Sequence, residues 1–118
     1  MSGILLNEGI VLTFNLFLVD SAKKWAEDKK FNFKFRSILY IYEIEDEDYQ
    51  MDFLMELNKM VKETEEKNIF IFLPYLTLLQ GILVYKVIQE VKKENQDKNI
   101  FICLPIERNN QVKIIGID

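Results

Sequence analysis

The side chains that could do chemistry follow the apolar strands predicted along the sequence, at the points where those strands end. Parallel strands bring their carboxyl ends to one edge of a sheet, and ligands bind beyond that edge where the strand order reverses. We therefore expect a ligand-binding crevice between the first and third strands. The residues predicted to line it are Asn15, Leu16, Pro74, Tyr75, Thr77, Gln80 and Arg108.

The chemistry predicted at this crevice is the binding of a small anion. Tyr75 and Thr77 begin a predicted helix, whose free amide groups suit a phosphate. Each residue also has a purely structural interpretation. Asn15 is a turn former, Thr77 can bond its own helix backbone, and Arg108 would be solvated in a predicted hairpin turn. No residue is assigned a catalytic role.

Several common functions are excluded by what the sequence lacks. It has no histidine and one cysteine, which removes His-based triads, most structural zinc sites and disulfide frameworks. Its four glycines, at positions 3, 9, 81 and 116, form neither a Walker loop nor a G-x-G-x-x-G motif. Cys103 falls inside a predicted strand, and the acidic residues 43–48 are interpreted as a solvated helix entry. We therefore predict no metal and no cofactor.

Length, composition and charge narrow the class of protein further. The 118 residues are 49% hydrophobic and 13% aromatic, which predicts one folded domain over residues 1–118. A formal net charge of −4 opposes binding to long nucleic acid, which needs a basic surface. The apolar run at residues 10–19 is interrupted by Thr13 and Asn15 and is about half the ~20 residues of a membrane span. We expect no targeting signal, no membrane contact and a cytoplasmic location.

Strands and amphipathic helices alternate along the sequence. The predicted strands cover residues 10–14, 38–42, 69–73, 100–104 and 112–117, and the predicted helices cover residues 19–29, 49–67 and 75–96. The last two strands form a hairpin. Residues 67–71 and 73–74 recur as residues 98–102 and 104–105, as two neighbouring parallel strands would give. Chance recurrence of strand-forming residues in a chain rich in Lys, Ile and Asn would give the same repeat.

The predicted fold class is α/β, a three-layer Rossmann-like open sheet with the connectivity β-α-β-α-β-α-β-β. Right-handed crossovers make 2-1-3-4-5 the simplest strand order, with the last strand antiparallel. This order puts the first helix alone on one face and leaves that face bare over the third and fourth strands. The third helix is also apolar all round as far as Tyr85. Either a partner subunit or the N-terminal residues must cover the bare face, and of the two we expect a homodimer with two-fold symmetry.

Three segments of the sequence resemble a small family of CRISPR-associated proteins from type III systems, which are reduced relatives of the CARF (CRISPR-associated Rossmann fold) domain. They are Val11-Leu12-Thr13-Phe14-Asn15 with the helix after it, Leu73-Pro74 before a hydrophobic helix, and the hairpin from Cys103-Leu104-Pro105 to Ile117. The resemblance runs from about residue 10 to the C-terminus. Asn15 matches the family's polar position after the first strand, and Pro74-Tyr75 matches the loop after the third. Asn15-Leu16-Phe17 replaces the family's small polar or His-Pro element, so no catalytic residue carries over.

The resemblance implies a ring nuclease that binds and slowly cleaves a cyclic oligoadenylate second messenger, with the tetramer as the expected ring. Attack by the 2′-OH on the 3′–5′ linkage, giving a 2′,3′-cyclic phosphate, needs neither metal nor histidine. A symmetric tetramer would fit the two-fold axis of a homodimer. The same features would serve a protein that only sequesters the ring, so cleavage, ring size and host or phage origin stay open.

An alternative from another class is an acidic interaction protein, such as an immunity protein or inhibitor that masks a basic surface. Its support is the acidic stretch at residues 43–48, the small size and the sequence pI of about 4.9. Such a module would use the acidic surface and ignore the crevice, which separates the two hypotheses.

Overall fold

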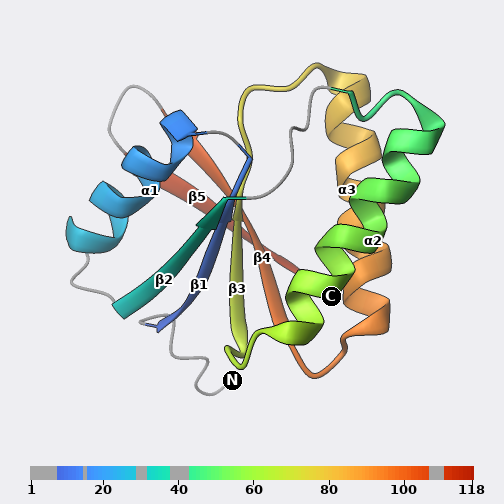
Figure 1. Cartoon of the computed structure of the whole chain (residues 1–118). Coiled ribbons are helices and arrows are strands. Elements are labelled where there is room, and N and C mark those ends of the chain that lie inside the picture. Colours follow the sequence, from blue (N-terminus) through green and yellow to red (C-terminus); the bar gives the residue numbers. More distant parts are fainter. Residues whose placement is uncertain (1–7, 15, 29–31, 38–42, 107–110) are drawn as a thin grey trace.

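Five strands and three helices alternate along the chain in the computed structural model, which describes residues 8–14, 16–28, 32–37, 43–106 and 111–118 (Figure 1). The strands are β1 (Glu8–Thr13), β2 (Asn32–Ser37), β3 (Asn68–Phe72), β4 (Asn99–Ile106) and β5 (Gln111–Ile117). The helices are α1 (Leu16–Asp28), α2 (Glu47–Glu63) and α3 (Leu78–Glu94). The predicted alternation of elements is confirmed.

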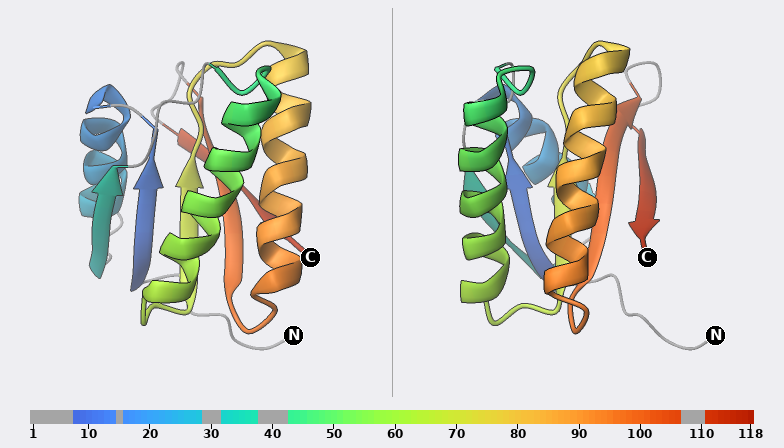
Figure 2. Two further views of the ribbon diagram at one scale, coloured as in Figure 1. Left: turned by 45° about the vertical axis from the view of Figure 1, so that its right-hand side comes forward. Right: turned by 90° about the vertical axis from the view of Figure 1, so that its right-hand side faces the viewer.

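The described strands form one sheet in the order β2-β1-β3-β4-β5, with β5 antiparallel to β4 and the other pairs parallel. Figure 2 shows the arrows of β1, β2 and β3 pointing one way and the arrow of β5 reversed. The Rossmann-like layout and strand order predicted from the sequence are therefore confirmed. The repeated segments lie side by side in register, with Asn68 opposite Asn99 and Phe70 opposite Phe101.

The position of β2 differs from the prediction. The strand predicted at residues 38–42 lies outside the described residues, and β2 is formed by the alternating segment before it. Phe33 and Phe35 are half-buried, whereas residues 32, 34 and 36 between them are exposed. Such alternation is typical of a strand with one solvated face, which suits a strand at the edge of the sheet.

The strand β4 extends two residues beyond its predicted end, through Pro105 to Ile106. Proline has no backbone N–H and cannot donate a hydrogen bond to a neighbouring strand. It therefore occurs in a sheet only where no neighbouring strand accepts from that position. Pairing between β3 and β4 ends at Cys103, which leaves β5 as the neighbour of Pro105, opposite Val112. The hairpin of β4 and β5 therefore projects beyond the carboxyl end of β3.

The two faces of the sheet are covered by α1 on one side and by α2 and α3 on the other (Figure 1). On the α1 side, the ring centroid of Trp25 lies 5.3 Å from that of Phe33 and 5.4 Å from that of Phe72. Phe70 stacks on Phe101 with centroids 5.1 Å apart. Phe70 and Phe72 are fully buried, so the expectation of a bare face over β3 and β4 is wrong. Aromatic rings from α1, β2 and the strands themselves fill the space that one helix would leave uncovered.

The face of the sheet under α2 and α3 holds an aliphatic core, built from Ile69, Ile71, Ile100 and Ile102 of the strands and from Leu57, Val61, Val84 and Ile88 of the helices.

The helix α2 begins at the acidic segment, where Oδ1 of Asp46 accepts from the backbone N–H of Tyr49 at 3.0 Å. Glu47 and Asp48 then occupy the first turn, where carboxylates meet the positive end of the helix. This confirms the predicted role of the segment as a helix entry. Within the described residues, no helix has the length and apolar content needed to cross a membrane.

Candidate functional site

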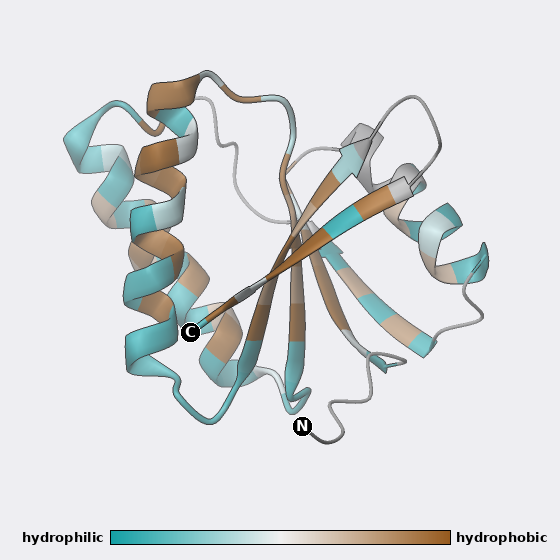
Figure 3. Ribbon diagram, turned by 180° about the vertical axis from the view of Figure 1, so that it is seen from behind, coloured by the Kyte–Doolittle hydropathy of each residue, from teal (hydrophilic) through white to brown (hydrophobic). Residues whose placement is uncertain are grey.

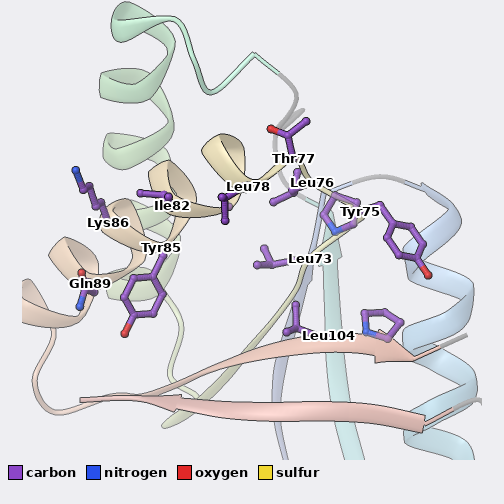
Figure 4. Close-up of a pocket in the computed structure, with 13 residues that line it drawn as sticks. Leu73, Tyr75, Leu76, Thr77, Leu78, Ile82, Tyr85, Lys86, Gln89 and Leu104 are labelled. Atoms are coloured by element: carbon purple, nitrogen blue, oxygen red, sulfur yellow. The ribbon is translucent and has the colours of Figure 1, made fainter.

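A pocket of about 770 Å³ opens at the carboxyl ends of β3 and β4 (Figure 4). It exists because the chain must leave the sheet after β3 to reach the helix layer, while the β4–β5 hairpin continues past that point. The described residues that line it are Leu73, Pro74, Tyr75, Leu76, Thr77, Leu78, Gly81, Ile82, Tyr85, Lys86, Gln89, Leu104 and Pro105.

The loop after β3 forms the roof of the pocket and is held at both ends. The N–H of Leu73 donates to the carbonyl of Cys103 at 3.1 Å, which continues the sheet by one residue. At the other end, Thr77 is the N-cap of α3. Its Oγ1 accepts from the N–H of Gln80 at 3.2 Å, and Oε1 of Gln80 accepts from the N–H of Thr77 at 3.0 Å. This reciprocal capping box fixes the first turn of the helix.

The pocket combines a mainly apolar wall with aromatic rings and one cation. Tyr75 is 72% exposed and Tyr85 is 43% exposed, and Figure 4 shows them on opposite sides of the pocket. Lys86 and Gln89 follow Tyr85 on α3, at the next residue and about one turn later, and Lys86 is the one charged side chain among the described lining residues. Such a lining can hold a flat apolar group and attract an anion beside it.

The sequence predicted part of this lining. Pro74, Tyr75 and Thr77 all line the pocket. Gln80 is not among the lining residues, because its side chain turns back to cap Thr77. The structural interpretation of Thr77 therefore fits its contacts.

The structure does not describe the position of three other predicted side chains relative to the pocket. Leu16 is the first residue of α1. Asn15 and Arg108 lie outside the described residues. The described pocket lies at the ends of β3 and β4, one strand away from the predicted crevice between β1 and β3.

Sequence reasoning missed the wall that α3 contributes. Leu78, Ile82 and Tyr85 recur three or four residues apart, on the side of the helix opposite the buried Val84 and Val87. That spacing is visible in the sequence, but an apolar helix is more typical of a core element or of a subunit contact. Figure 3 shows that the first turn of α3 is hydrophobic although it stands away from the sheet.

The first turn of α3 contains two backbone N–H groups to which the structure assigns no acceptor within the part of the chain that it describes. Gln80 and Gly81 donate their N–H groups to Oγ1 and to the carbonyl of Thr77, respectively. Among the described residues, no acceptor receives the N–H groups of Leu78 and Leu79. The predicted phosphate-binding amides are thus reduced to the first two of the helix.

Among the described residues, two groups have clearly shifted pKa values, and neither lines the pocket. Burial raises the pKa of the Cys103 thiol, which keeps it protonated and unreactive. Burial also raises the pKa of Tyr49, with further contributions from Glu43 and Glu56. The described residues bring no three carboxylate or thiol side chains together around a possible metal position.

A Rossmann-like sheet with a pocket beyond the carboxyl ends of its strands has the architecture of a ligand-binding α/β protein. Comparison of the chain with protein-family models, with curated proteins and with solved structures finds no match. A functional proposal therefore depends on the fold, on the pocket and on the resemblance carried by the three sequence segments.

Proposed function

We propose that this protein binds a small nucleotide in the pocket at the ends of β3 and β4, and that the ligand is a cyclic oligoadenylate. The observation that carries the proposal is the pocket itself, whose volume of about 770 Å³ falls in the range of small-molecule sites, ~300–1,000 Å³. It lies at the sheet edge where ligands of such folds bind. The oligoadenylate class comes from the resemblance to CARF-related proteins.

The lining residues divide into two roles under this proposal. Tyr75 and Tyr85 offer aromatic faces on opposite sides of the pocket, on which adenine bases stack. Lys86 and the amide of Leu78 supply positive charge and a donor for a phosphate. The apolar side chains between them exclude water, which strengthens both kinds of contact.

The proposal extends to slow cleavage of the ring. The 2′-oxygen loses its proton and attacks the phosphorus, and the 5′-oxygen leaves with a proton, which gives a 2′,3′-cyclic phosphate. The part of the chain is to align these three atoms and to stabilise charge on the phosphoryl oxygens. Such a reaction should proceed unchanged in EDTA. A cytoplasmic location belongs to the same proposal, because a lone free thiol such as Cys103 is ordinary there.

The test is calorimetric titration with cyclic oligoadenylates of three to six units, followed by chromatography of the products. Loss of one stacked base costs about 1–3 kcal/mol, so Tyr75→Ala should weaken binding roughly five- to 150-fold. Lys86→Ala should weaken it about tenfold or more. The matched control is Lys59→Ala, an exposed lysine on α2 away from the pocket, which should bind like the wild type. Absence of binding at millimolar ligand would contradict the proposal.

The acidic interaction module remains the second candidate, because residues 43 and 45–48 are all exposed at the start of α2. Asp46 caps the helix, so its removal would disturb the fold as well as the charge. A cleaner variant is Glu45→Gln with Glu47→Gln. If that variant loses a protein partner while Tyr75→Ala retains it, the interaction module replaces the nucleotide-binding proposal.

A further inference from the structure

Gly81 lies at a helical position where glycine is unfavourable. It is the fourth residue of α3 and lies in the body of the helix, where glycine is a weak helix former. A Cβ built at Gly81 would have no atom of the protein within 4 Å, whereas a Cβ at Gly9 would lie 2.5 Å from the carbonyl oxygen of Asn68. The packing of the described chain therefore explains the glycine at position 9 but not the one at position 81.

The residues around Gly81 form an exposed apolar stripe, which comprises Leu78, Ile82 and Tyr85 on α3. Leu78 is 83% exposed and Ile82 is 45% exposed. With the adjoining Leu79, which is 52% exposed, the stripe exposes about 450 Å², taking ~200 Å² for a fully exposed large side chain. A stable interface buries ~800 Å² per partner including its polar rim. The stripe thus supplies most of the apolar area that one side of a dimer needs.

We propose that α3 packs antiparallel against α3 of a second copy of this chain, with Gly81 at the point where the two helices cross. The residue pattern is self-complementary under a two-fold axis placed between positions 81 and 82. Ile82 of the partner subunit then lies over Gly81, and Tyr85 of the partner subunit lies over Leu78. Each contact occurs twice, as a two-fold interface requires. A glycine at the crossing point lets the two backbones approach closely, which explains its presence.

The packing at this interface does not require the proposed nucleotide ligand, although the interface and the pocket share residues. Leu78, Gly81, Ile82 and Tyr85 also line the pocket, so the partner helix becomes part of its wall. The same axis brings Lys86 to the amino end of α3 of the partner subunit, next to its positive dipole. Replacement of this lysine by an acid should therefore favour the dimer, while it weakens the binding of an anion.

The experiment is sedimentation velocity from 1 to 100 µM, with circular dichroism to check folding. The wild type should sediment at twice the 14.1 kDa mass of the chain. Ile82→Arg and Gly81→Leu should each weaken self-association at least a hundredfold, and Lys86→Glu should strengthen it two- to tenfold. The control is Met55→Arg, which places the same charge at an apolar residue of α2 that is 67% exposed and lies off the stripe.

Three results would overturn the proposed interface: a wild type that stays at 14.1 kDa throughout, a dimer that survives both Ile82→Arg and Gly81→Leu, and a dimer lost in Met55→Arg. Two variants are used because one may be compromised in folding, and circular dichroism identifies it. A wild-type dimer that binds no cyclic oligoadenylate would support the interface and contradict the nucleotide proposal, so the two can fail separately.

Discussion

The two ends of β3 and β4 differ in how their polar groups are used. At the amino ends, polar side chains bond to one another and to backbone: Nδ2 of Asn99 donates to Oδ1 of Asn68 at 3.0 Å, and Nδ2 of Asn68 donates to the carbonyl of Glu8 at 3.1 Å. At the carboxyl ends, the same two strands lead into an open pocket with exposed tyrosines. We call these two ends of β3 and β4 the amino edge and the carboxyl edge. The polar groups of the amino edge stabilise the fold, and the carboxyl edge is left available for a ligand or a partner.

Lys98 is the centre of the amino edge. Its side chain is buried, and its Nζ donates to the carbonyls of Thr64 at 2.6 Å and Glu66 at 3.0 Å, at the end of α2 and in the loop that follows. Nζ of Lys92 donates in turn to the carbonyl of Lys98. A charged group buried in this way is stable only because carbonyl acceptors replace its water. Lys86, at the other edge, is exposed. Two lysines thus differ in environment: Lys98 is buried and bonded to backbone carbonyls, whereas Lys86 is exposed at the pocket.

The largest expected effect is at the amino edge. Lys98→Met keeps most of the apolar stem but removes both hydrogen bonds and leaves two carbonyls without a donor, so it should lower the free energy of unfolding by about 2–3 kcal/mol. Urea denaturation measures this, with the exposed Lys59→Met as the control, expected within about 0.5 kcal/mol of the wild type. Ligand binding by the folded fraction should not change. A loss below about 1 kcal/mol would mean that Lys98 contributes little to stability.

A smaller effect is expected where the carboxyl edge serves the fold. Thr77→Ala removes the cap of α3 and should cost about 1 kcal/mol of stability, because the N–H of Gln80 loses its acceptor. Thr77→Ser retains the hydroxyl and should restore most of it, as denaturation would show. If Thr77→Ala instead leaves stability unchanged and abolishes nucleotide binding, Thr77 is a binding residue. The carboxyl edge would then contribute to binding and not to the stability of the fold.

The smallest expected effect has the opposite sign. Gly81→Ala adds a methyl group where no atom lies within 4 Å, so it should stabilise the monomer by about 0.5–1 kcal/mol through helix propensity. Thermal denaturation below 1 µM, where self-association is weakest, is the appropriate measurement. Destabilisation of the monomer would show that contacts within the chain require a glycine at position 81. The carboxyl edge would then stabilise the fold, as the amino edge does.

Much of the fold was predictable because its signals are local. The strand order follows from alternating elements, right-handed crossovers and the repeat of residues 67–71 at 98–102, which the structure places in register. The site was predictable only in part. The loop after β3 is identifiable because it follows a strand. The wall from α3 is not, because an exposed Leu78 and a buried Val84 have similar hydropathy in a sequence.

The sequence by itself determined the alternation of strands and helices, the order of the sheet, the acidic entry of α2 and the absence of histidine chemistry, because each depends on residue type and on spacing along the chain. Only the tertiary structure decided that Phe70 and Phe72 are covered by Trp25 and Phe33, and that Lys98 is buried while the first turns of α3 are exposed. Those outcomes depend on which surfaces meet across the sheet. Hydropathy measures the tendency of a side chain to leave water, and the packing of distant segments decides whether a surface exists to receive it.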